Sequence, residues 1–225
     1  MLYGSLNIKL ENINAILITH EHIDHTKSLA TISKKYNIPI YTNEKTWNAI
    51  TKNTNLKSNN NIIFKNEEKF EIGNLKIFPF STPHDAADPC GFNISDNNKK
   101  ISIATDIGNM NSKILKHLEN SSFVMLEANY DPEVLKFSSY PYSLKRRISG
   151  PNGHLENQKA GQTICKLINS GLKDALLIHL SKENNFPELA YKTVVEEIQK
   201  GNFNENSVNI IVAPRNNPSS LFLVS

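Results

Sequence analysis

Three histidines and one aspartate lie within six residues in the stretch THEHIDH, directly after the apolar run AILI. They are His20, His22, Asp24 and His25. Neutral imidazole and carboxylate are the ligands that Zn²⁺ and similar divalent ions prefer in proteins. Four such side chains on one turn cannot all reach a single ion without strain. The spacing therefore predicts a loop that serves two neighbouring metal ions, although a lone histidine at a strand end is usually structural.

Further residues of the same chemical types follow apolar runs later in the chain. His84 lies beyond KIFPFSTP, Asp106 follows ISIAT, and His179 follows ALLI. Strand ends meet at one edge of a sheet, which is where the ligand sites of α/β folds lie. We therefore expect these residues to complete the metal site, with Asp106 placed to bridge the ions. His117 has no partner motif and is expected to be solvated.

Short runs rich in Ile, Leu, Val and Phe alternate with amphipathic stretches, a pattern typical of an α/β fold. The apolar runs predict strands at 14–19, 38–42, 62–65, 75–80, 91–95, 100–105, 122–127, 175–179 and 208–213. The amphipathic stretches predict helices at about 27–36, 44–52, 111–119, 156–170 and 187–200. With 225 residues and neither long linkers nor repeats, the chain is expected to form a single domain over 1–225.

Composition limits the class of protein but does not select a function. The formal net charge of +3 permits contact with a polyanion without arguing for one. Cys90 and Cys165 form no CxxC pair and no signal peptide precedes the fold, so we expect a reducing, cytoplasmic location. No apolar run approaches the roughly 20 residues that span a bilayer, so no membrane partner is expected.

The stretch THEHIDH resembles the signature of the metallo-β-lactamase superfamily, and later motifs extend the resemblance along almost the whole chain. The resemblance implies an αββα sandwich with a dinuclear metal centre at one edge. Superfamily chains usually carry a β-hairpin before the histidine motif, where this chain has only MLYGSLNIKLENIN, so the sandwich is expected to lack it. The resemblance divides the ligands between two divalent ions, Zn²⁺ or Mn²⁺: His20, His22 and His84 for one, Asp24, His25 and His179 for the other, and Asp106 between them.

The residues that flank the ligands favour the nucleases of the superfamily. True β-lactamases carry a Cys where this chain has ATDIG, and glyoxalase-type thioesterases carry GHTxG where it has STPHDAADPCGF. That segment, with LEANYD, GPNGHLEN and HLSKENN, resembles the YycJ/WalJ family of DNA exonucleases, relatives of tRNase Z and RNase J. The resemblance spans roughly residues 14–215.

The same resemblance implies a mechanism. In the tRNase Z enzymes a glutamate-histidine pair outside the metal shell protonates the leaving oxygen, and Glu127 and His154 stand in comparable contexts. A hydroxide held between two ions would attack phosphorus while His154, oriented by Glu127, protonates the leaving alkoxide. Asp24 and Asp106 would keep the ions in register. The alternative for His154 is a structural role, capping the helix that follows it.

The substrate contacts are predicted from two stretches. In SSYPYSLKRRISGPNGHLEN the basic residues Lys145, Arg146 and Arg147 lie near two tyrosines, a combination that can bind phosphates and stack on the bases of a nucleic acid, DNA by the resemblance. A short basic run is also a common solvated surface. In HLSKENN, Ser181 and Asn184 either line the phosphate site or hold the loop that carries His179.

Two other functions remain open alongside a metal-dependent phosphodiesterase. A small-molecule hydrolase of the thioesterase or lactonase kind would not need Glu127 and His154, and it should cleave model esters but not nucleic acid. An inactive binding module need not retain two metal ions.

Overall fold

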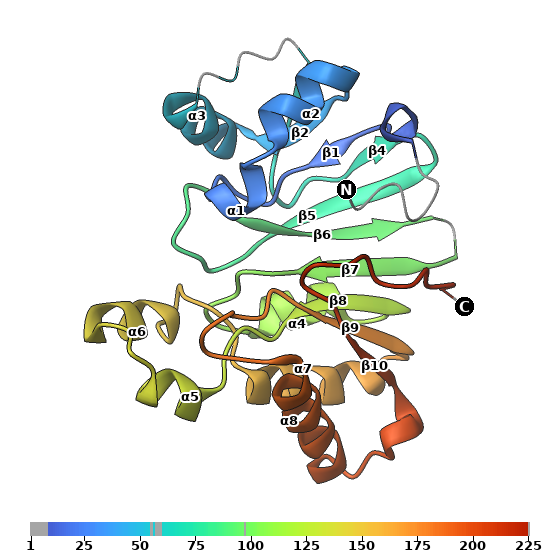
Figure 1. Ribbon diagram of the computed structural model, residues 1–225. Coiled ribbons are helices and arrows are strands. Elements are labelled where there is room, and N and C mark those ends of the chain that lie inside the picture. Colours follow the sequence, from blue (N-terminus) through green and yellow to red (C-terminus); the bar gives the residue numbers. More distant parts are fainter. Residues whose placement is uncertain (1–8, 55, 57–59, 97, 225) are drawn as a thin grey trace. The chain divides into compact units, whose positions relative to one another are not determined.

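The computed structural model describes residues 9–54, 56, 60–96 and 98–224. The chain divides into two compact units (Figure 1). Unit 1 comprises residues 1–81 and 85–92, and unit 2 comprises residues 82–84 and 93–225. The strand β6 (Cys90–Ser95) carries the chain from one unit to the other. A single domain over 1–225 stays a prediction, and each unit is described by itself.

Unit 1 is built on a parallel sheet in the order β1 (Ile16–Leu17), β2 (Ile40–Asn43) and β3 (Asn61–Phe64). The connections between these strands carry the helices α1 (Ile23–Thr26), α2 (Leu29–Tyr36) and α3 (Glu44–Asn53). The Asn43 side chain caps α3 by accepting a hydrogen bond from the Thr46 amide at 2.9 Å. A hairpin of β4 (Phe70–Ile72) and β5 (Leu75–Ser81) turns at Gly73, whose φ of 57° favours glycine.

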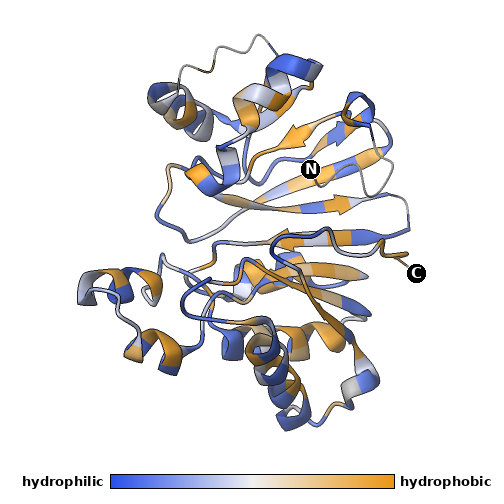
Figure 2. Ribbon diagram, viewed as in Figure 1, coloured by the Kyte–Doolittle hydropathy of each residue, from blue (hydrophilic) through white to orange (hydrophobic). Residues whose placement is uncertain are grey.

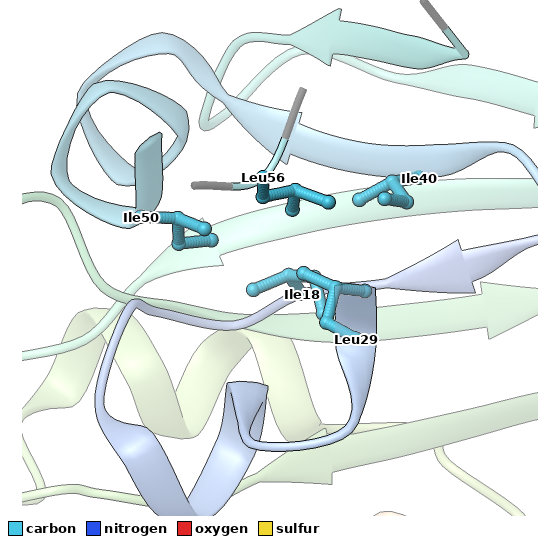
Figure 3. Packing of buried hydrophobic residues seen from close by; sticks show 5 residues of the cluster. All are labelled: Ile18, Leu29, Ile40, Ile50 and Leu56. Carbon is cyan, nitrogen blue, oxygen red and sulfur yellow. The ribbon is translucent and has the colours of Figure 1, made fainter. Parts of the chain in front are cut away.

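A cluster of buried aliphatic side chains holds the helices of unit 1 against its parallel sheet. Ile18, Leu29, Ile40, Ile50 and Leu56 converge in Figure 3, and none is more than 9% exposed. Each fully buried side chain of this size stabilises the fold by about 1.5–3 kcal/mol relative to exposure. Ile18 and Leu29 lie immediately before and after the loop 19–28, so burial of both fixes the two ends of the predicted metal-binding loop.

Unit 2 contains a parallel sheet whose strands follow one another in chain order. β7 (Lys100–Ala104), β8 (Phe123–Glu127), β9 (Asp174–Ile178) and β10 (Asn209–Val212) pair successively. The connections carry α4 (Ser112–Leu118), then α5 (Pro132–Phe137), α6 (Tyr142–Ile148) and α7 (Asn157–Ile168), and finally α8 (Pro187–Lys200). Right-handed crossovers between strands in this order place the covering helices on one face, and α7 accordingly contacts both α4 and α8.

The hydropathy of unit 2 matches this layering. Figure 2 shows hydrophobic residues along β7, β8 and β9, whereas α7 and α8 carry both hydrophobic and hydrophilic residues. The apolar side of α7 buries Ile164 and Leu167, and that of α8 buries Val194 and Ile198. Among the described residues, no helix combines the length and the apolar character that crossing a bilayer requires.

Most of the longer elements lie where the apolar runs and amphipathic stretches predict them, but the periodicity does not predict the short elements α1, α5, α6 and β4. Elements of three to seven residues are too short to show a full period, so their caps are the better signal. Asp131 at the N-cap and Pro132 at the first position of α5 are such a signal. The Gly73–Asn74 turn likewise marks the hairpin of β4 and β5.

We expect Ile40→Ala to lower the free energy of unfolding by about 2–5 kcal/mol, because it leaves a cavity in the cluster of Figure 3. Ile63→Ala on the adjacent strand is the matched control, since that side chain is 46% exposed, and it should cost less than about 1 kcal/mol. Urea unfolding of both variants measures the difference. Equal losses would show that the cluster does not support unit 1.

Candidate metal centre

The strand register of unit 2 brings its predicted site residues to one edge of the sheet. Glu127 is the last residue of β8 and lies opposite Ile178 of β9, so His179 follows directly beside it. Ala104 of β7 lies opposite Leu126, which places Asp106 just past the same edge. Three parallel strands thus deliver two carboxylates and an imidazole to one place, the usual position of a site in an open α/β sheet.

Ligand-type side chains from four segments of unit 2 converge at this edge. Asp106, Glu127, His154 and His179 each offer a nitrogen or oxygen within 4.8 Å of the others. Asp106 Oδ1 lies 3.5 Å from His84 Nε2, 3.5 Å from His154 Nδ1 and 3.6 Å from His179 Nδ1. Two buried carboxylates therefore face three imidazole rings, an arrangement that suits a divalent cation.

The Glu127 carboxylate is completely buried and accepts hydrogen bonds at both oxygens. Oε1 accepts from His154 Nδ1 at 2.8 Å and from His179 Nδ1 at 2.9 Å. Oε2 accepts from the backbone amides of Ile107 at 2.8 Å and Leu155 at 3.0 Å. Burial alone would raise the pKa of Glu127, but the hydrogen bonds from the two histidines outweigh it and lower the pKa to about 2. Glu127 is therefore an ionised acceptor that holds two rings and two loops.

These hydrogen bonds determine which ring nitrogens can bind a metal. An ionised carboxylate can only accept, so Nδ1 of His179 carries a proton and Nε2 is the nitrogen for a metal. His84 Nδ1 likewise donates to the Gly153 carbonyl at 2.9 Å, which assigns its Nε2 to a metal. Metal-binding histidines usually donate their second ring nitrogen to a carboxylate or carbonyl in this way. The residues of unit 2 thus fit a divalent ion in donor type, and His84 fits it in orientation as well, because its Nε2 is the atom that faces Asp106.

Two of the predicted ligands have backbone conformations that are uncommon for residues with a side chain. Asp106 has φ of 56° and His179 has φ of 59°, both in the left-handed region. Neighbouring hydrogen bonds hold them there: Ile107 donates its amide to Glu127, and Asn129 Nδ2 donates to the His179 carbonyl at 2.7 Å. Backbone strain of this kind concentrates at functional sites, where the surrounding structure enforces it.

Unit 1 carries the predicted ligands of THEHIDH on the loop between β1 and α1 and on α1 itself. The ring centroids of His20 and His22 are 4.6 Å apart, and those of His20 and His25 are 4.1 Å apart. Thr19 Oγ1 contacts Nδ1 of His20 at 3.0 Å and of His25 at 3.4 Å. His20 is 1% exposed, whereas the Asp24 side chain is 61% exposed. The loop therefore gathers three rings and leaves its carboxylate at the surface.

The predicted ligands are divided between the two units: the four of THEHIDH belong to unit 1, and His84, Asp106 and His179 belong to unit 2. Within unit 2 the structure brings its three ligands together around Asp106. The assignment of both sets to the same pair of ions stays a prediction.

The structure adds residues that the sequence analysis missed. The Gly153 carbonyl orients His84, and Asn129 holds the His179 backbone. Gly108 packs so closely that a Cβ there would overlap backbone atoms of Pro151 and Gly153. Asn129 could have been found, because it lies two residues after Glu127 within the motif LEANYD. A contact made by a backbone carbonyl, such as that of Gly153, cannot be predicted from the type of residue, because every residue has a carbonyl.

The environment of His154 differs from that of a helix cap. The helix α7 begins after Glu156, and the His154 ring instead donates to Glu127. Its side chain keeps 20% of its surface exposed, whereas Glu127 keeps none. His154 is thus the member of the pair that a bound molecule can reach.

The polar side chains of Ser181 and Asn184 hydrogen-bond within the loop HLSKENN and fix its conformation. Asn184 is completely buried, and its backbone and side-chain amides both donate to Ser181 Oγ, at 3.1 Å and 3.3 Å. The Ser181 amide donates to the Asn129 carbonyl at 2.8 Å. These contacts favour the role of holding the loop that carries His179, and a substrate contact by Ser181 or Asn184 stays a prediction.

The basic run of α6 divides into structural and exposed members. Lys145 Nζ donates to the Lys136 and Ser138 carbonyls, both at 2.7 Å, and so closes the end of α5. Arg146 and Arg147 are exposed, and a phosphate contact by either residue stays a prediction.

Comparison with known proteins gives a family match over most of the chain. The family model described as "Beta-lactamase superfamily domain" matches residues 4–180. The chain is 33% identical over 203 residues to exodeoxyribonuclease YycJ of Bacillus anthracis, covering 90% of this chain and 77% of that protein. It is 35% identical over 200 residues to exodeoxyribonuclease WalJ of Streptococcus pneumoniae, covering 88% of this chain and 74% of that protein.

The fold is also similar to that of solved structures. The metallo-beta-lactamase fold protein YhfI from Bacillus subtilis superposes with a TM-score of 0.67 at 16% sequence identity, covering 94% of this chain and 78% of that one. At this identity the likeness bears on the fold alone, and it confirms the predicted α/β fold class.

We expect Glu127→Gln to weaken metal binding by about 10–100-fold, the usual cost of losing a partner of a metal-binding histidine. Glutamine has one acceptor oxygen, so whichever way it turns, its amide group faces N–H donors. Competition with a chromogenic chelator measures the affinity. Glu183→Gln, an exposed glutamate of the His179 loop, is the matched control. Unchanged affinity in Glu127→Gln would show that the carboxylate does not orient a ligand.

Proposed function

Because this chain belongs to the beta-lactamase superfamily and is a metal-dependent hydrolase, we propose that it hydrolyses phosphodiester bonds and degrades DNA from an end. The observation that carries the proposal is the Glu127–His154 pair beside Asp106 and His179, because a thioesterase or lactonase would have no use for it. The names of the YycJ and WalJ relatives support DNA as the substrate and an exonuclease as the kind of enzyme.

The proposal includes two divalent ions, Zn²⁺ or Mn²⁺, held by the residues that the superfamily resemblance assigns. These are His20, His22, Asp24, His25, His84, Asp106 and His179. Bound ions supply Lewis acidity, which lowers the pKa of coordinated water and neutralises charge on the phosphoryl group. The chain's contribution is orientation: Gly153 and Glu127 set the rings of His84 and His179 through their Nδ1 atoms.

His154 is the proposed proton donor to the leaving oxygen. An alkoxide is a poor leaving group, so cleavage of a nucleotide linkage needs a proton in the transition state. The hydrogen bond from Nδ1 to Glu127 fixes the ring, and the exposed part of the side chain allows a substrate to approach. Glu127 is a positioning residue, because complete burial keeps it from the substrate.

Arg146 and Arg147 are the proposed phosphate contacts. Both are exposed on α6, and the segment after α6 leads directly to His154, whose amide donates to the Ile148 carbonyl at 2.8 Å. Guanidinium groups in this position can pair with the backbone of a strand without reading its sequence.

The test compares two leaving groups. We expect His154→Ala to lower hydrolysis of end-labelled DNA by about 10²–10⁴-fold, because the alkoxide then leaves without a proton. Hydrolysis of thymidine 5′-p-nitrophenyl phosphate should fall less than about tenfold, because p-nitrophenolate leaves without help. His117→Ala, a histidine outside the cluster, is the matched control, and rates are measured with added Mn²⁺ or Zn²⁺.

Equal losses on both substrates would remove the proton-donor role. Wild-type protein that carries metal, cleaves a thioester or lactone, and leaves 5′-labelled and 3′-labelled DNA and RNA intact would replace the phosphodiesterase proposal with a small-molecule hydrolase.

A second prediction concerns metal content. We expect about two ions per wild-type chain and about one after Asp24→Ala, since Asp24 is assigned to the second ion only. Elemental analysis of dialysed protein gives the count. Glu71→Gln, an exposed carboxylate of unit 1, should keep both ions. The assignment would be contradicted if the wild-type chain held only one metal ion, or if Asp24→Ala held as many ions as the wild type.

A further inference from the structure

Two aromatic rings of unit 2 are held in water at adjoining helix ends. Phe137 is the last residue of α5 and is 77% exposed, and Tyr142 is the first of α6 and is 76% exposed. By contrast, Phe123 and Tyr130 of the same unit are 4% and 3% exposed. Burial of a large aromatic ring stabilises a fold, and these two exposed rings do not contribute that stabilisation. The two residues are five positions apart in the chain, one at the end of α5 and one at the start of α6.

Each exposed ring has a cation at its face. Lys136 Nζ lies 5.2 Å from the centroid of Phe137, and Arg146 Cζ lies 5.9 Å from that of Tyr142. Both distances are within the range of a cation–π contact. The nearby acid is Glu133, 3.4 Å from Lys136 Nζ. Proteins bind single-stranded nucleic acid by stacking aromatic rings on its bases and placing cations near its phosphates, and this surface offers both groups. An apolar protein surface would gain nothing from the two cations.

Hydrogen bonds and one buried side chain fix the helices that carry these rings. Asp131 Oδ1 accepts hydrogen bonds from the Glu133 and Val134 amides and caps the start of α5. Lys145 reaches from α6 to two carbonyls at the end of α5, as described above. Leu135, 4% exposed, anchors α5 in the core. The surface is therefore preorganised, which lowers the entropic cost of binding.

The same helices are tied to the loop that carries His154. The His154 amide donates to the Ile148 carbonyl at the end of α6, and Gly153 donates to Gly150 at 2.9 Å. A helix of seven residues, such as α6, is about 10 Å long. Figure 1 shows α5 and α6 next to each other at one side of unit 2. A strand bound at His154 could therefore extend along α6 to the rings.

We propose that Lys136, Phe137, Tyr142 and Arg146, here termed the α5–α6 platform, bind unpaired bases of the DNA strand by stacking. This inference rests on the proposed function and adds the form of the substrate: the strand reaches the platform unpaired, either as single-stranded DNA or at the opened end of a duplex. The rings stack on bases of any sequence, and the two cations pair with the phosphates between them.

The test uses the metal-loaded double variant Phe137→Ala/Tyr142→Ala and a labelled single-stranded phosphorothioate oligonucleotide, whose linkages resist hydrolysis, with fluorescence anisotropy as the readout. Loss of each stacking contact should weaken binding about tenfold or more, whereas affinity for a blunt duplex should change less than about threefold. Tyr142→Phe keeps the ring and should keep the affinity. Tyr191→Ala on α8 removes a tyrosine that is 47% exposed and is the matched control.

Hydrolysis of thymidine 5′-p-nitrophenyl phosphate separates this inference from the proposed function, because so short a substrate cannot reach the platform. The double variant should keep wild-type rates on it and an unchanged urea unfolding curve. Wild-type affinity for the single strand in the double variant overturns the platform, as does a wild-type protein that binds no strand. If the double variant loses strand affinity but the wild type cleaves no phosphodiester, the platform stands and the hydrolase proposal fails.

Discussion

The buried Glu127 carboxylate is the interaction on which the organisation of unit 2 depends. It accepts hydrogen bonds from the residue after Asp106, from the residue after His154, and from the rings of His154 and His179. Placing an ion in the interior is costly unless its hydrogen bonds are satisfied, and here both oxygens are. Removing the carboxyl group would leave donors from three separate loops without an acceptor. The same group therefore stabilises the sheet edge and sets the geometry of the candidate centre.

This arrangement couples a predicted metal ligand to the predicted proton donor. His154 and His179 share one carboxylate oxygen, so neither ring can turn without disturbing the other's partner. The contributions of hydrogen bonds that share an acceptor are not additive when the partners are removed singly. The chemistry of the site thus depends on a residue that has no exposed surface of its own.

Much of the fold follows from local sequence, because strands such as β8 and β9 are continuous apolar runs and α7 and α8 have a clear apolar face. The ligand types were readable for a similar reason, since His179 directly follows ALLI. What the sequence could not give depends on register and on contacts between distant segments. The carbonyl of Gly153 and the burial of Asn184 arise only once the loops are packed. Short helices such as α5 are stabilised by tertiary contacts, and periodicity cannot reveal them.

Several features of unit 2 that are locally unfavourable lie on one connected path. Asp106 and His179 adopt left-handed backbone conformations, and Phe137 and Tyr142 leave their rings in solvent. Sequences selected for stability alone would remove such features, since each lowers the margin of folding by an amount comparable to a single core contact. Hydrogen bonds to Glu127 connect the strand ends to the His154 loop, and the bond from the His154 amide to Ile148 connects that loop to α6. If the proposed function holds, a bound nucleic-acid strand would offset part of this cost by pairing the cations with phosphates and covering the rings with bases.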